Sequence, residues 1–70
     1  MSTRNFGRLV REKRERKRLT IARTAELAGL TPEGLSHIEL GDSVPKLSSV
    51  LSIAAVLDID LGDIEGCKPL

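Results

Sequence analysis

The stretch TIARTAELAGLTPEGLSHIELG, residues 20–41, predicts two short helices joined by a tight turn. Ala25 is small enough to let the second helix pack closely against the first. Gly29 follows the first helix, where a left-handed residue ends a helix without strain on a Cβ atom. Leu35 is the apolar anchor that we expect on the inner face of the second helix. These residue types allow two helices to cross at short distance.

Capping residues set the limits of the two helices. Thr20 is a typical N-cap and predicts a first helix over residues 21–28. Pro32 suits the first position of a helix, because no N–H group is needed there, and it begins a second helix over residues 32–40. Gly41 ends this second helix.

Apolar spacing predicts further helices on both sides of this segment. An amphipathic helix is expected over residues 3–17, with Phe6, Leu9 and Val10 as its apolar stripe. An apolar helix is expected over residues 46–58, and its inward-facing residues at helical spacing are Leu47, Val50, Leu51, Ala54 and Leu57. Asp60 can cap a short fifth helix over residues 61–65. The sequence therefore predicts a single all-α, compact five-helix domain over residues 1–70.

Composition excludes several classes of function. The single cysteine, Cys67, cannot form an internal disulfide, and the longest apolar stretch is far shorter than the ~20 residues of a membrane span. The N-terminal residues lack the apolar region of a secretory signal, so a soluble cytoplasmic protein is expected. No metal-ligand cluster, nucleotide-binding glycine motif or catalytic set is present, so we expect no enzyme, no cofactor and no metal.

Charge is distributed unevenly along the chain. Residues 1–23 contain nine Lys or Arg and two acidic residues, whereas residues 24–70 contain two Lys and eight acidic residues. Such asymmetry indicates a basic face for an anionic partner. A solvated basic first helix explains the same composition equally well.

The sequence resembles the Cro/Xre (lambda-repressor-like) family of helix-turn-helix DNA-binding regulators over residues 6–64. Residues 20–41 are the core of this resemblance. Matching residues in the flanks are Phe6-Gly7, Val10-Arg11, Arg14, Ile38-Glu39, Gly41, Pro45, Ile53-Ala54, Leu57 and Ile59.

The resemblance implies binding to double-stranded DNA, with residues 32–40 in the major groove and a homodimer on a palindromic operator. The base contacts implied by this comparison are Pro32, Glu33, Ser36 and His37. The backbone contacts are Arg14, Thr20, Ile21, Thr31, Ser43 and Lys46. Further candidate backbone cations are Arg4, Arg8, Arg11, Lys17 and Arg23. No membrane or small-molecule ligand is expected as a partner.

Two of these assignments have alternatives. Arg14 and Glu39 match an ion pair typical of the family, and we favour this pairing over the alternative of two independent surface charges. Glu33 can accept a hydrogen bond from a cytosine amino group, or it can simply stabilise the positive end of its helix.

A second hypothesis about function is favoured by Ile21, Glu33 and Asp42, which weaken the DNA-binding face, whereas the basic N-terminal third argues against it. Ile21 stands where the family usually has a phosphate-contacting Gln, Thr24 where a core Leu is typical, and Lys13 where an apolar residue is more common. Asp42 and Glu33 oppose binding to phosphate. The alternative is a helix-turn-helix scaffold that binds a protein, such as a toxin partner or an adaptor.

Overall fold

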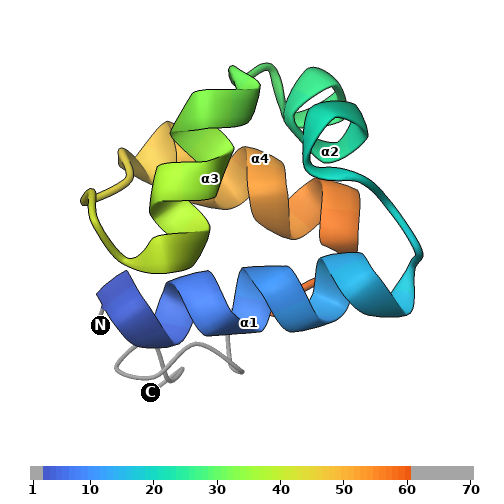
Figure 1. The fold of residues 1–70 in the computed structure, drawn as a ribbon, viewed down its shortest axis with the longest axis horizontal. Coiled ribbons are helices and arrows are strands. Elements are labelled where there is room, and N and C mark those ends of the chain that lie inside the picture. The colour runs from blue at the N-terminus through green and yellow to red at the C-terminus, as the bar shows by residue number, and fades with distance from the viewer. Residues whose placement is uncertain (1–2, 61–70) are drawn as a thin grey trace.

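The computed structural model describes residues 3–60, and these residues form four helices (Figure 1). The helices are α1 (Thr3–Arg16), α2 (Ile21–Ala28), α3 (Pro32–Leu40) and α4 (Leu47–Leu57). The all-α prediction is confirmed for this part of the chain. The fifth helix expected over residues 61–65 lies outside the described residues, so a count of five helices is not supported.

Local capping explains where α2 and α3 begin and end. The Thr20 hydroxyl accepts a hydrogen bond from the Arg23 N–H at 3.0 Å, and the Thr31 hydroxyl accepts one from the Gly34 N–H at 3.0 Å. Gly29 ends α2 with φ 73°, a left-handed conformation that favours glycine. The predicted limits of both helices are confirmed.

The four helices enclose one apolar core. In Figure 1, α1 lies along one side of the molecule, and α3 lies in front of α4. Helices α1 and α3 pack against each other, and α2 packs on both α3 and α4. The buried apolar residues are Phe6, Val10, Ala25, Leu35, Ile38, Val50, Ile53, Ala54, Leu57 and Ile59. Because α3 contributes only Leu35 and Ile38 to this core, its opposite face remains at the surface.

The expected inner face of α4 is partly wrong. Leu47 and Leu51 are 73% and 48% exposed, whereas Ile53 is fully buried. The helix begins at Leu47, with Lys46 as its N-cap, and the side that packs on α1 and α2 does not include Leu47 or Leu51. The inward residues repeat at positions i, i+3, i+4 and i+7, which are Val50, Ile53, Ala54 and Leu57.

Thr24 occupies a core position despite its hydroxyl group. Its side chain is fully buried, and its Oγ1 atom has no hydrogen-bond partner. A buried hydroxyl without a partner loses its hydration and gains nothing in return. This departure from the expected Leu therefore lowers the stability of the domain.

Within residues 3–60, no helix has the length and apolar character needed to cross a membrane. The same residues contain no group of three or more His, Cys, Asp or Glu side chains arranged to bind a metal.

Candidate nucleic-acid interface

The first turns of α2 and α3 each leave backbone N–H groups without a helical acceptor. Each capping threonine accepts a hydrogen bond from only one N–H group of its helix. The N–H groups of Ile21 and Ala22 belong to the first turn of α2, where no helical carbonyl can accept them. Together with the positive end of the helix dipole, such groups favour an anion such as a phosphate.

Close packing fixes α3 against α2. Ala25 and Leu35 are both fully buried, and the backbone between the helices turns through Gly29. The Leu30 N–H donates to the Ala25 carbonyl oxygen at 2.8 Å, which holds the turn against the end of α2. The surface of α3 therefore has a defined orientation relative to the N-terminus of α2.

The predicted base-contacting side chains share the outer face of α3. Pro32, Glu33 and His37 are exposed and Ser36 is half-buried, while Leu35 and Ile38 point into the core. No hydrogen bond or ion pair joins Glu33 to another described residue. Both alternatives for Glu33 stay open, because its place in the first turn of α3 suits the helix dipole as well as a DNA base.

Sequence reasoning missed Leu40 at the end of this face. It is 61% exposed, one turn beyond Ser36 and three residues beyond His37. Residues spaced by three or four positions lie on one side of a helix, so Leu40 extends the same face. An apolar side chain there can contact a thymine methyl group or an apolar surface of a protein.

Arg14 and Glu39 form a two-point ion pair between α1 and α3. Arg14 Nε donates to Glu39 Oε2 at 2.7 Å, and Arg14 Nη2 donates to Glu39 Oε1 at 3.1 Å. Arg14 Nη1 also donates to the Leu19 carbonyl oxygen at 2.8 Å. The two side chains are only 12% and 6% exposed, so they are not independent surface charges. The hydrogen bonds to Glu39 raise the pKa of Arg14 above its ordinary value, against the opposing effect of desolvation.

This ion pair lies beside a hollow where three helices meet. The hollow has a volume of about 180 Å³ and is lined by Arg11, Arg14, Ile21, Ser36, Glu39 and Leu40. Arg11 and Arg14 come from α1, Ile21 begins α2, and the other three belong to α3. Ile21 contributes an apolar wall here, where the amide of the family's usual Gln would be polar. The structure thus brings Arg14, Ile21 and Ser36 of the predicted site together.

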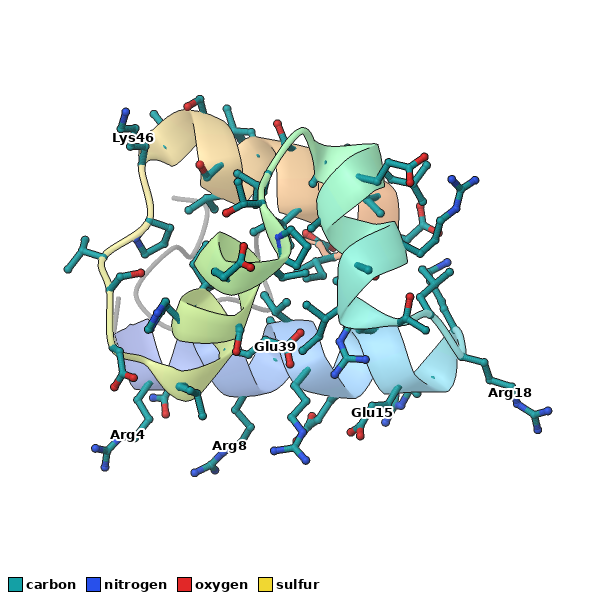
Figure 2. All side chains as sticks on the ribbon, turned by 45° about the horizontal axis from the view of Figure 1, so that its top comes forward. Arg4, Arg8, Glu15, Arg18, Glu39 and Lys46 are labelled. Atoms are coloured by element: carbon teal, nitrogen blue, oxygen red, sulfur yellow. The ribbon has the colours of Figure 1, made fainter. Side chains whose placement is uncertain are left out.

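A second group of predicted backbone contacts lies in the connection between α3 and α4. Ser43 and Lys46 are both exposed, and Lys46 lies far from the α1 side chains (Figure 2). Lys46 precedes α4 and makes no hydrogen bond or ion pair with another described residue, so its ammonium group is available to an external anion. Asp42 in the same connection is exposed and lies 3.8 Å from the His37 ring nitrogen Nδ1. This acid opposes the approach of a phosphate at this point.

The cations of residues 4–23 differ in their partners. Lys17 binds Asp58 at 2.7 Å, Arg23 binds Glu26 at 2.9 Å, and Arg14 binds Glu39. The hydrogen bond from Lys17 lowers the pKa of Asp58. By contrast, no hydrogen bond or ion pair joins Arg4 or Arg8 to another described residue. The predicted basic face therefore includes cations that are already paired and cations that are not.

Comparison with known proteins places this geometry in context. A family model described as a helix-turn-helix matches residues 10–64, which is most of the chain and includes the whole of α2, α3 and α4. No match was found among curated proteins.

Proposed function

Because the chain belongs to the Cro/Xre-type helix-turn-helix family, we propose that it regulates transcription by binding a specific double-stranded DNA sequence. In this proposal α3 enters the major groove, and the first turn of α2 contacts the phosphate backbone. Such a regulator acts on DNA in the cytoplasm, and its binding needs neither a cofactor nor an enzymatic step.

The outer face of α3 is the observation that carries this proposal. Its exposed side chains Pro32, Glu33 and His37 have no role in the core, and Ser36 lies beside the hollow. A carboxylate can accept from a cytosine amino group, a hydroxyl can donate or accept, and an apolar ring can contact a thymine methyl group. These chemical groups suit recognition of base edges.

Phosphate contacts would hold α3 in register. On one side of α3 these contacts come from the Thr20 cap, the Ile21 backbone N–H and the remaining N–H groups of Arg14. On the other side they come from Ser43 and Lys46. Thr31 contributes at the start of α3 itself. Contacts of this kind position a protein on DNA and carry no sequence information by themselves.

A homodimer on a palindromic operator completes the proposal. One domain offers few base contacts, and two copies would read half-sites about 34 Å apart. Ile59, an apolar residue after α4, is buried in the core and cannot supply surface for a dimer. Helix α4 offers Leu47 and Leu51 instead, and it contains no charged residue, so two copies could meet there without burying a charge.

Binding to a protein partner is the second candidate function. The observation that favours it is the exposed Leu40 on the same face as Glu33, with Asp42 close behind. An apolar side chain flanked by acids suits a protein surface better than a polyanion. In that case α3 would bind a partner protein and no preferred DNA sequence would exist.

Selection from a randomised duplex library distinguishes the two functions. The wild type should enrich a palindromic sequence, and its affinity should fall steeply as the salt concentration rises. The Glu33→Gln variant should change the preferred base at one position if Glu33 reads a base, and identical selected sequences would show that it does not. Weak binding without an enriched sequence would overturn the regulator proposal and favour the protein partner.

A further inference from the structure

We infer that Arg4, Arg8 and Arg11, here called the α1 arginine stripe, form a phosphate-binding surface that borders α3. The inference rests on the proposed DNA-binding function and extends it. The stripe would contact the DNA backbone beside the groove that α3 enters, and it would raise affinity without reading sequence.

The three arginines lie on one side of α1. At about 100° per residue, positions 4, 8 and 11 fall within about 60° of one another around the helix axis. All three side chains are exposed. Figure 2 shows Arg4 and Arg8 projecting from the same edge of α1. The rise of an α-helix spaces the stripe over about 10 Å along α1.

Contacts between α1 and α3 place this stripe next to the proposed recognition face. Gly7 lies directly against the backbone of α3, because a Cβ atom there would be 2.2 Å from the Ile38 carbonyl oxygen. A Cβ atom on Gly41 would be 3.1 Å from the Arg4 Cα atom. Arg4 is therefore beside the C-terminal end of α3.

The other end of the stripe borders the middle of α3 and the start of α2. Arg11 lines the hollow together with Ser36 and Ile21. The stripe thus runs along α3, from the hollow near the first turn of α2 to the turn that precedes Ser43. The Arg11 end therefore lies at the region around the first turn of α2 where phosphate contacts are proposed. A DNA backbone bound there could continue along α1 past Arg8 and Arg4.

The charges of the stripe are largely uncompensated within the described chain. Arg4 and Arg8 make no hydrogen bond or ion pair with another described residue. Arg11 approaches Glu15 at 3.7 Å, and both side chains are more than half exposed, so this pair contributes little. Like charges at successive turns of a helix repel each other and lower its stability slightly. A phosphate backbone would remove this repulsion.

The spacing of the stripe also suits DNA. Successive phosphates of one strand lie about 3.4 Å apart along the duplex axis, so a stripe of about 10 Å parallel to that axis faces about three of them. Guanidinium groups are well shaped for this contact because they can donate two parallel hydrogen bonds to one phosphate.

Arg16 provides a matched control on the same helix. It is exposed, has no hydrogen bond or ion pair with another described residue, and lies about 80° or more around the axis from each member of the stripe. A loss of net charge alone would act equally at Arg16 and at Arg8. A specific contact with phosphate would act at Arg8 only.

The test is a salt titration of DNA affinity for the wild type, Arg8→Gln, Arg16→Gln and the triple variant Arg4→Gln, Arg8→Gln, Arg11→Gln. The slope of log K against log salt is negative, and each lost phosphate contact should make it less steep by about 0.9. Binding should then be weakened about eightfold more at 0.1 M salt than at 1 M. We expect a slope less steep by about 0.9 for Arg8→Gln and by about 2.7 for the triple variant. Arg16→Gln should leave the slope unchanged. Circular dichroism checks that each variant folds, and Arg8→Gln serves as the test if the triple variant does not.

The outcomes separate the stripe from the proposed function. If the wild type enriches a sequence but the triple variant or Arg8→Gln keeps the wild-type slope, the inference that the stripe binds phosphate is wrong and the regulator proposal stands. If the slope falls for the stripe variants but no sequence is enriched, the stripe is supported and sequence-specific binding is wrong. If the wild type binds no duplex at all, both are wrong. Equal losses for Arg8→Gln and Arg16→Gln would also overturn the stripe, because they would indicate a general effect of charge.

Discussion

Removal of Arg14 should destabilise the domain more than removal of any exposed arginine. In Arg14→Met, the Glu39 carboxylate would lose both guanidinium hydrogen bonds while it remains 94% buried by its surroundings, since only 6% of its side chain is exposed. Breaking a buried ion pair from one side costs about 3–5 kcal/mol. We take about 3 kcal/mol, because the pair borders the surface hollow and solvent can approach it.

This magnitude is large for so small a domain. At about 0.05–0.15 kcal/mol per residue, a chain of 70 residues has a free energy of unfolding of about 4–10 kcal/mol. A loss of about 3 kcal/mol corresponds to a fall in Tm of about 12–24 °C. Arginine is charged at every accessible pH, so a measurement at pH 7 is made with the guanidinium in its ionised form.

The assay is thermal and urea unfolding of four proteins, the wild type, Arg14→Met, Arg16→Met and the double variant Arg14→Met, Glu39→Met. Arg16→Met should cost at most about 0.5 kcal/mol, since exposed substitutions of this kind have small effects. The double variant should be more stable than Arg14→Met, because no buried charge then lacks a partner. The reasoning is refuted if Arg14→Met is as stable as Arg16→Met, or if the double variant is no more stable than Arg14→Met.

Three further substitutions test the packing and the charges. Thr24→Val replaces a buried hydroxyl without a partner by a methyl group and should raise the free energy of unfolding by about 1 kcal/mol, and an unchanged or lower Tm would contradict this. Gly7→Ala places a Cβ atom 2.2 Å from the Ile38 carbonyl oxygen, must displace α1 from α3, and should lower the free energy of unfolding by at least about 2 kcal/mol in urea unfolding. Lys17→Gln should lower Tm slightly at pH 6, because it removes the ion pair with Asp58. This pair lowers the pKa of Asp58 in the folded protein, so it stabilises the fold at pH values above the pKa that Asp58 has in the unfolded chain. This difference should vanish as the pH falls through the lowered pKa of Asp58, and a difference that persists in acid would exclude the ion pair as its cause.

Local rules explain why the central helices could be predicted from sequence. The threonines at positions 20 and 31 cap their helices in the conformation that their residue type favours, Pro32 suits the first position of a helix, and Gly29 adopts without strain the left-handed conformation that ends one. Each of these signals depends on neighbours within one helical turn. No knowledge of the tertiary structure is needed to read them.

Helix α4 was harder to predict because its sequence is apolar or small on every side. A window with Leu47, Val50, Leu51 and Ala54 has helical spacing, but so does one with Val50, Ile53, Ala54 and Leu57. The choice between them is made by contacts with α1 and α2, which the sequence of α4 does not contain. The exposed Leu47 and Leu51 follow from this choice.

The candidate interface, too, could be predicted only in part from the sequence. The outer face of α3 follows from helical spacing once Leu35 and Ile38 are recognised as core residues. The place of Arg11 beside Ser36 depends on how closely α1 approaches α3, and that distance is set by the missing side chain of Gly7. A single glycine thus determines which arginines border the recognition face, and its importance becomes visible only in the folded chain.

The most direct test of the account is a backbone-amide NMR titration of the protein with the duplex that the selection enriches. Binding through α3 and the first turn of α2 predicts the largest shifts at residues 20–22 and 31–37, with smaller shifts at residues 43–46. Shifts confined to α4, or spread evenly over the surface without a maximum at α3, would contradict the central claim that α3 is the recognition helix.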